Sequence, residues 1–214
     1  MRGRYAAAVI AIVGWASLLL QFVLHITNPL APDVSFAELL IRFFSYFTIL
    51  TNILVAVMAA VIAFFPSTRL GRFLSGPSAL AAVAVYITIV GVVYSLFLRD
   101  VWDPVGWQAV ADHALHDVVP VLYVIYWLVF APKPGIDWSD PIKWLAYPAA
   151  YLIYSLARGA AVGWYPYWFA DVTLLGYPTA LTNAAAVMLA FAAVGFAFAG
   201  VAKLLSRTAI GRAS

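Results

Sequence analysis

The chain is built from long blocks of apolar residues separated by short polar segments. Each block reaches roughly the 20 residues that an α-helix needs to cross the hydrocarbon core of a bilayer. Helices are the expected spanning form, because they satisfy every backbone hydrogen bond internally. The pattern predicts an all-α integral membrane protein, a bundle of six transmembrane helices at residues 5–27, 39–65, 77–98, 110–131, 142–162 and 179–205.

The segments between the blocks are short, which predicts one membrane domain over residues 1–214 and no separate soluble domain. The basic start at Met1–Arg4 imitates a signal peptide. However, the apolar run that follows continues to Leu24 without a small-x-small cleavage site. We therefore expect this run to be retained as the first transmembrane helix.

The positions of lysine and arginine predict the orientation of the bundle. Such residues concentrate in cytoplasmic loops, and most of those in this chain fall on the same side of successive blocks. We therefore expect both termini in the cytoplasm, a multi-pass protein of the plasma membrane, and outward-facing loops near 28–38, 99–109 and 163–178. The residues assigned to the cytoplasmic side are Arg2, Arg4, Arg69, Arg72, Lys133, Lys143, Lys203, Arg207 and Arg212.

Composition agrees with the membrane class and excludes several functions. The chain is 65% hydrophobic and 10% charged, whereas soluble domains are about half apolar and a quarter charged. The net charge of +3 comes without a dense basic cluster, which argues against nucleic-acid binding. The absence of cysteine excludes disulfides, thiolate metal sites and cysteine nucleophiles. The expected partners are membrane lipids, and the oligomeric state is left open.

The segment Asp112-His113-Ala114-Leu115-His116-Asp117 precedes an apolar run and holds two of the three histidines. Ionisable groups at the head of a membrane span are costly to desolvate and therefore mark candidate functional sites. In a helix, the two histidines would share one face, with Asp112 reaching His116 and Asp117 reaching His113 at i,i+4. A carboxylate so placed fixes the histidine tautomer and supports formation of the imidazolium.

A polar stripe crosses the second block at spacings of a single helical face. Glu38 and Arg42 are placed to neutralise each other at its outer end, and Ser45, Thr48 and Asn52 continue it inward. Such a stripe is expected to face the bundle interior. Hydroxyls in membrane helices also commonly bond the i−4 carbonyl or join helices, which is the structural alternative.

Further candidates lie in the last two blocks. Arg158, near the outer end of the fifth block, is a candidate for an anionic headgroup or a substrate carboxylate, or else it pairs with Asp171. Tyr154 lies one turn before it as a substrate contact. Asn183 in the sixth block is a polar helix contact or a substrate contact.

Three chemistries fit these residues. In the first, Thr48 is a nucleophile, His116 is its base, Asp112 orients His116 and Asn52 donates to an oxyanion, with a lipid ester as substrate. In the second, the three histidines bind zinc with an aspartate in support; its ligands would be His25, His113 and His116. In the third, the His–Asp pairs are a proton relay or a polar core in a lipid-binding or transport bundle.

Short motifs along the chain resemble the androgen-induced protein family, which includes the androgen-dependent tissue-factor-pathway-inhibitor-regulating protein and has bacterial six-span relatives. The resemblance, closest to the bacterial branch, covers nearly the whole chain in span order. The motifs are Phe47-Thr48-Ile49, His113-Ala114-Leu115-His116 followed by Pro120, Arg158-Gly159, and Gly163-Trp164-Tyr165-Pro166-Tyr167.

This resemblance implies an intramembrane threonine hydrolase that needs no metal or other cofactor and acts on fatty acid esters of hydroxy fatty acids. Carried over by position, the nucleophile is Thr48 and the base is His116, with His113 in a supporting role. Two departures from the animal members are present. Thr51 stands where those proteins have an aspartate, which makes it a rival nucleophile. Pro120 is one residue closer to the second histidine.

Overall fold

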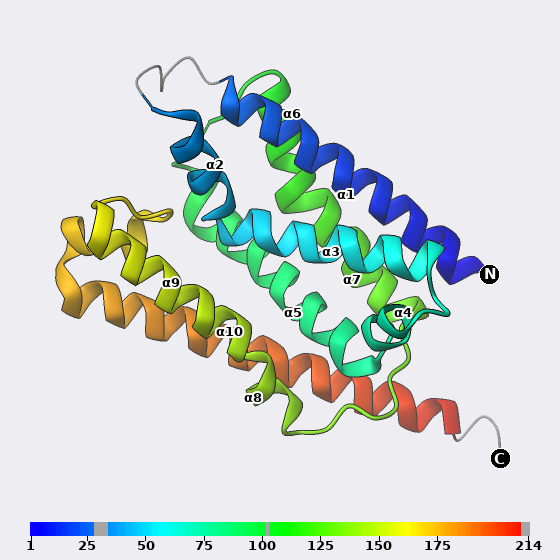
Figure 1. Ribbon diagram of the computed structural model, residues 1–214. Coiled ribbons are helices and arrows are strands. Elements are labelled where there is room, and N and C mark those ends of the chain that lie inside the picture. Colours follow the sequence, from blue (N-terminus) through cyan, green and yellow to red (C-terminus); the bar gives the residue numbers. More distant parts are fainter. Residues whose placement is uncertain (28–33, 102, 211–214) are drawn as a thin grey trace. The chain divides into compact units, whose positions relative to one another are not determined.

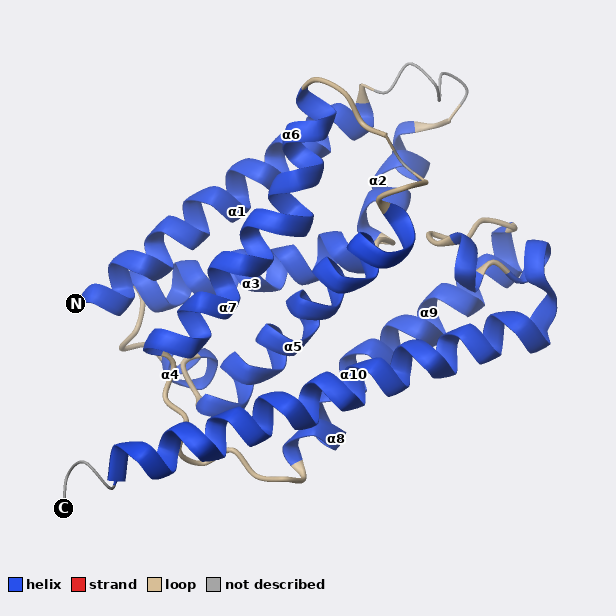
Figure 2. Ribbon diagram, turned by 180° about the vertical axis from the view of Figure 1, so that it is seen from behind, coloured by secondary structure: helices blue, strands red, loops and turns tan. Residues whose placement is uncertain are grey.

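The computed structural model describes residues 1–27, 34–101 and 103–210. This part of the chain consists of helices joined by loops and contains no strand (Figure 2). Within that part, five helices are long and apolar enough to cross a membrane, which supports the membrane class. Arg212 of the predicted cytoplasmic set lies outside the described residues. The five helices are Arg2–Ile26, Phe47–Phe64, Pro77–Leu98, Trp107–Phe130 and Val172–Arg207.

The chain divides into two units, Met1–Lys133 and Pro134–Ser214. The single membrane domain expected from the short loops stays a prediction, as do the six-span count and the orientation. The first unit contains α1 (Arg2–Ile26), α2 (Phe36–Phe44), α3 (Phe47–Phe64), α4 (Arg69–Leu74), α5 (Pro77–Val93), η1 (Tyr94–Leu98), α6 (Trp107–His113), η2 (Ala114–Val118) and α7 (Val119–Phe130).

Four long helices form the body of the first unit (Figure 1). Helix α1 packs against α3 and α7, and α5 packs against the same two helices. The buried face of α1 is rich in small residues, including Ala7, Ala11 and Gly14, which allow close helix approach. Its opposite face carries large exposed apolar side chains, as expected for contact with lipid: Val9, Ile12, Trp15, Leu19 and Val23.

The second predicted span is not one helix. Helix α2 ends at Phe44, and α3 begins at Phe47 after an extended residue, Tyr46 (φ −81°, ψ 127°). The break falls in the run from Phe43 to Phe47, where aromatic residues and serine are mediocre helix formers. The expectation of a single polar face from Glu38 to Asn52 is therefore wrong, and Thr48 instead lies in the first turn of a new helix.

Two stretches of π-helix interrupt the third and fourth spans. Segment η1 follows α5 without a break, and η2 lies between α6 and α7. Each π-helical turn accommodates an extra residue, which rotates the side chains that follow, and such turns are frequent at functional sites. A small apolar cluster lies beside η2 and joins it to α1, α2 and α3; its buried members are Leu18, Phe43, Ile49, Ala56 and Leu115.

The second unit is a pair of long helices with short helical connections. It contains α8 (Asp140–Trp144), α9 (Ala146–Val162), η3 (Trp168–Ala170) and α10 (Val172–Ile210). Helix α9 has 17 residues and spans about 25 Å, somewhat less than a typical hydrocarbon core. Helix α10 is interrupted at Gly176, whose backbone (φ 72°, ψ 159°) suits glycine, and Pro178 follows in the next turn.

Candidate active site

The two His–Asp pairs predicted from the sequence are both present. Nδ1 of His116 lies 3.3 Å from the carboxylate of Asp112, and Nδ1 of His113 lies 2.8 Å from that of Asp117. The two histidines differ in exposure: the side chain of His116 is 14% exposed and that of His113 is 57% exposed. The π-helical segment η2 begins directly after His113 and contains His116. The expectation of a shared helical face assumed a regular α-helix, which this segment is not.

The contacts of His116 determine which ring nitrogen carries the proton. Its Nδ1 lies 2.9 Å from the backbone carbonyl oxygen of Asp112 as well as close to the Asp112 carboxylate. A carbonyl oxygen only accepts hydrogen bonds, so Nδ1 carries the hydrogen. The neutral ring then has its lone pair on Nε2, which is the form a general base requires.

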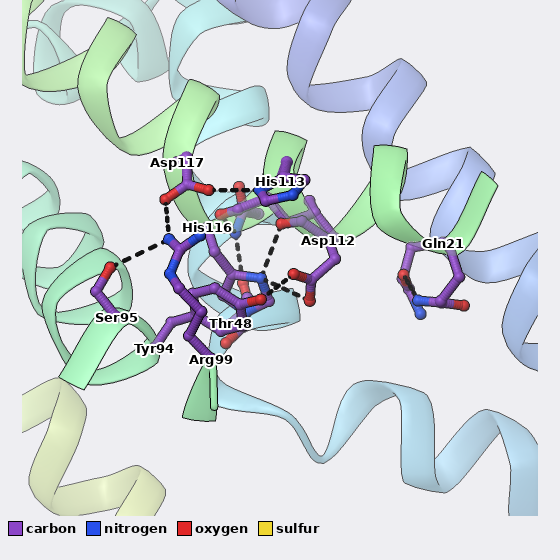
Figure 3. A network of polar contacts seen from close by, with 12 residues as sticks. Gln21, Thr48, Tyr94, Ser95, Arg99, Asp112, His113, His116 and Asp117 are labelled. Atoms are coloured by element: carbon purple, nitrogen blue, oxygen red, sulfur yellow. Dashed lines mark hydrogen bonds and ion pairs between the residues drawn. The ribbon is translucent and has the colours of Figure 1, made fainter. Parts of the chain in front are cut away.

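Tyr94 completes the buried pair and was missed by the sequence reasoning. Its hydroxyl donates to Oδ2 of Asp112, and its ring stacks on the imidazole of His116 with centroids 4.0 Å apart and planes 15° apart. All three side chains appear together in Figure 3. A tyrosine at the end of an apolar span looks like an ordinary interfacial aromatic residue, so the sequence carried no clear signal of this role.

The exposed pair has a different partner, Arg99. Its guanidinium donates to the Asp117 carboxylate at 2.5 Å and to the Ser95 hydroxyl at 3.3 Å (Figure 3). The hydrogen bond to Asp117 raises the pKa of Arg99 above its ordinary value, so the guanidinium stays charged. Here a signal was available in the sequence, because Arg99 is a basic residue in a loop that the positions of lysine and arginine predict to face outward, where few basic residues are expected.

Asn52 joins α3 to η2 and so brings Thr48 close to the segment that carries His116. Its Nδ2 donates to the carbonyl oxygen of Thr48 at 2.9 Å and to that of Leu115, the residue before His116, at 3.2 Å. Thr48 belongs to the polar group drawn in Figure 3. The bond to Thr48 lies within α3, and the bond to Leu115 joins α3 to η2. In this structure Asn52 is a bridge between segments, which differs from the expected role of oxyanion donor.

The two candidate nucleophiles differ in burial. Thr48 is 9% exposed, and Thr51 is fully buried. Thr48 also lies in the first turn of α3, where the amide groups of the helix carry partial positive charge. Ser45 is fully buried and its hydroxyl donates to the Ile41 carbonyl at 2.6 Å, which ties it to the end of α2. The predicted pair of Glu38 and Arg42 is confirmed at 2.8 Å.

The histidines are not brought together as a metal site. Nε2 of His25 lies 2.9 Å from the Leu39 carbonyl oxygen, and its ring lies beside Phe43. Among the described residues, no group of three or more His, Cys, Asp or Glu side chains is arranged to hold a metal ion. The zinc alternative with His25, His113 and His116 therefore has no support from the geometry.

The remaining candidates belong to the second unit. The guanidinium of Arg158 donates to the Trp164 carbonyl at 3.3 Å and lies over the Trp164 ring at 4.7 Å. Tyr154 is half-exposed beside Tyr151. Asn183 donates to the Phe169 carbonyl at 2.9 Å and so links α10 to η3. A substrate role for Arg158, Tyr154 and Asn183 stays a prediction.

Comparisons with known proteins return nothing: no family model matches the chain, and no curated protein or solved structure is significantly similar to it.

Proposed function

We propose that the protein is an intramembrane hydrolase of lipid esters that uses Thr48 as nucleophile and His116 as general base. The observation that carries the proposal is the Asn52 bridge, which ties the residue before His116 to the backbone of Thr48. A largely buried histidine whose Nδ1–H bonds the backbone of an aspartate, with the carboxylate of that aspartate beside it, is suited to activate a hydroxyl nucleophile. The resemblance of the motifs to the androgen-induced protein family points to the same two residues.

The chemistry follows from these groups. Nε2 of His116 accepts the hydroxyl proton as the Oγ atom of Thr48 attacks the ester carbonyl. The positive end of α3, in whose first turn Thr48 lies, favours the negative charge that develops on the carbonyl oxygen. The tetrahedral intermediate then expels the alcohol, which takes the proton from His116 and leaves an acyl group on Thr48.

Water completes the cycle by the same route in reverse. His116 takes a proton from the attacking water, the acyl–Oγ bond breaks, and the proton returns to Thr48 as the fatty acid leaves. The imidazolium formed in each half-reaction faces the carboxylate of Asp112. Neither half requires a metal or another cofactor. The proposed substrates are esters of hydroxy fatty acids or similar membrane lipids, reached from the outer leaflet of a plasma membrane.

Activity-based labelling tests the assignment of the nucleophile. The purified protein is treated with a fluorescent phosphonate probe that reacts with serine and threonine hydrolases, alongside Thr48→Ala and Thr51→Ala. We expect labelling of the wild type and of Thr51→Ala, and none of Thr48→Ala. Labelling that disappears only in Thr51→Ala would move the nucleophile to that residue, and an unlabelled wild type would contradict the proposed function.

The orientation of the site is tested separately. The same probe in a membrane-impermeant form is added to right-side-out and to inverted vesicles that contain the protein. Preferential labelling in right-side-out vesicles is expected for a site that opens to the outer leaflet. Preferential labelling in inverted vesicles would reverse the predicted topology without affecting the assignment of Thr48.

A further inference from the structure

We propose that Tyr94 is a positioning residue that holds His116 and Asp112 in the geometry of a base and its orienting carboxylate. The inference rests on the proposed function, in which His116 is the base. It starts from the way Tyr94 engages both members of the pair at once. Its hydroxyl donates to Asp112, and the face of its ring covers the imidazole of His116.

These two contacts restrain different degrees of freedom. Oδ1 of Asp112 faces Nδ1 of His116, while Oδ2 accepts from Tyr94, so the phenol fixes the carboxylate about its Cβ–Cγ bond. The stacked ring limits rotation of the imidazole about its own Cβ–Cγ bond. Nδ1–H bonds the backbone carbonyl of Asp112 at 2.9 Å, and the two Tyr94 contacts keep the Asp112 carboxylate beside it at 3.3 Å. Through the rigid ring, they also fix the direction in which the Nε2 lone pair points.

The backbone is built to bring Tyr94 to this place. Gly91, one turn before Tyr94, lies against η2, and a Cβ there would come within 3.1 Å of the His116 carbonyl oxygen. The absence of a side chain therefore lets α5 approach the backbone that carries the histidine. The π-helix η1 begins at Tyr94, and a π turn alters the direction of the side chains that follow an α-helical run.

No other side chain in the described part of the chain has the same pair of contacts. Tyr94 is almost completely buried, and Arg99 lies 4.8 Å from its ring centroid. Tyr123 offers a matched comparison, because it is a buried tyrosine of the same unit. Its hydroxyl donates to the sulfur of Met58 at 2.7 Å. Loss of the Tyr123 hydroxyl changes packing in the core without touching the histidine.

The test is the tautomer of His116, measured by nitrogen-15 NMR on the full-length protein with labelled histidine in lipid nanodiscs. The His116 signals are assigned by their loss in His116→Gln. At a pH where the ring is neutral, we expect the Nδ1–H form to predominate in the wild type. In Tyr94→Phe the ratio of Nδ1–H to Nε2–H should fall by up to roughly fivefold, because the Asp112 carboxylate loses the hydroxyl that keeps it beside Nδ1, while the backbone acceptor of Asp112 is unchanged.

Tyr94→Leu removes the ring as well and should broaden the His116 signals through exchange, whereas Tyr123→Phe should leave them unchanged. An unaltered tautomer ratio in Tyr94→Phe would overturn the inference, whatever the activity. If Tyr94→Leu does not fold, Tyr94→Phe decides alone, because it preserves the ring and its packing. If Tyr94→Phe and Tyr123→Phe changed the His116 signals by the same amount, the inference would also be overturned. Tyr94 would then act on His116 no more than any other buried tyrosine.

Ester hydrolysis provides the second readout. We expect kcat to fall about tenfold in Tyr94→Phe with KM nearly unchanged, since orientation of the base affects the chemical step more than binding. A tenfold fall in kcat/KM that came entirely from a higher KM, with kcat unchanged, would contradict a positioning role. A wild type without hydrolase activity would sink the proposed function. The tautomer measurement would then still decide whether Tyr94 orders the His116–Asp112 pair.

Discussion

The two His–Asp pairs at the head of the fourth span have the same residue types and the same i,i+4 spacing, yet they lie in different environments. The pair of His116 and Asp112 is buried, whereas the pair of His113 and Asp117 is about half-exposed. The π-helical segment η2 begins between the two histidines, and a π turn alters the direction of the side chains that follow it. Spacing alone therefore selects the partner of each histidine and leaves its surroundings undetermined.

The partners of the two carboxylates differ more than their burial. Asp117 binds the guanidinium of Arg99, a permanent cation, as well as His113. Asp112 instead bonds the Tyr94 hydroxyl and faces His116, and Arg99 acts on it through space without a direct ion pair in the described structure. The carboxylate of Asp112 therefore faces His116 directly, where it can stabilise an imidazolium, whereas that of Asp117 is shared between His113 and Arg99. This difference is the reason that we propose the pair of His116 and Asp112, rather than the pair of His113 and Asp117, for the chemistry.

Substitution of one histidine at a time should give the largest difference in ester hydrolysis between the two pairs. We expect ester hydrolysis in His116→Gln to fall by roughly 10³-fold, since a positioned general base contributes about 10²–10⁴-fold. The matched variant His113→Gln should retain activity within about threefold. Steady-state hydrolysis of a lipid ester in detergent measures both. Equal losses in the two variants would remove the distinction between the pairs.

Exchange of the carboxylates should give the next largest contrast. In Asp112→Asn the amide offers a donor where His116 needs an acceptor, so the opposite tautomer is favoured, and kcat should fall by roughly 10²-fold or more. Asp117→Asn should change kcat by less than about fivefold. The measurement is kcat and KM for each variant. A larger effect at Asp117 would assign the catalytic histidine to the exposed pair.

The Asn52 bridge should matter for stability because it joins the buried pair to α3. Asn52→Leu removes the side-chain donor to the Leu115 carbonyl, together with the additional bond to the Thr48 carbonyl, at a cost of roughly 1–3 kcal/mol of unfolding free energy. Gln108→Leu is the control, since it breaks the half-buried hydrogen bond to Gln21 between α1 and α6. Thermal unfolding in detergent should show a clearly larger loss of stability for Asn52→Leu than for Gln108→Leu. Equal losses of stability would show that the Asn52 bridge does not contribute more than an ordinary hydrogen bond between helices.

The effect of salt on the melting temperature should be the smallest of these effects, and it should come only from the exposed pair. Raising the ionic strength from about 0.05 to 0.5 M shortens the Debye length severalfold and screens the Arg99–Asp117 contact. We expect the melting temperature to fall by no more than about 2 °C, with no such fall in Arg99→Met. Hydrolysis should be insensitive to salt in both proteins. A strongly salt-dependent rate would indicate that the exposed pair takes part in the reaction.

Local features of the fold were predictable because they depend on composition and helical period. The third predicted span, residues 77–98, coincides with α5 and η1, and the first and fourth are within a few residues of the observed helices. The three i,i+4 partnerships, Glu38 with Arg42 among them, are confirmed because an isolated helix already brings such side chains together. Burial of the apolar blocks in lipid requires no knowledge of the neighbouring helices.

The features that define the site depend on packing between helices. The break before α3, the π turn of η2 and the stacking of Tyr94 on His116 each involve segments far apart in the chain or departures from helical period. The sequence by itself determined an all-helical membrane class, most span positions and the carboxylate partner of each histidine. Only the tertiary structure decided which pair is buried, because burial depends on which neighbouring groups approach the histidine segment, here the backbone at Gly91 and the side-chain amide of Asn52.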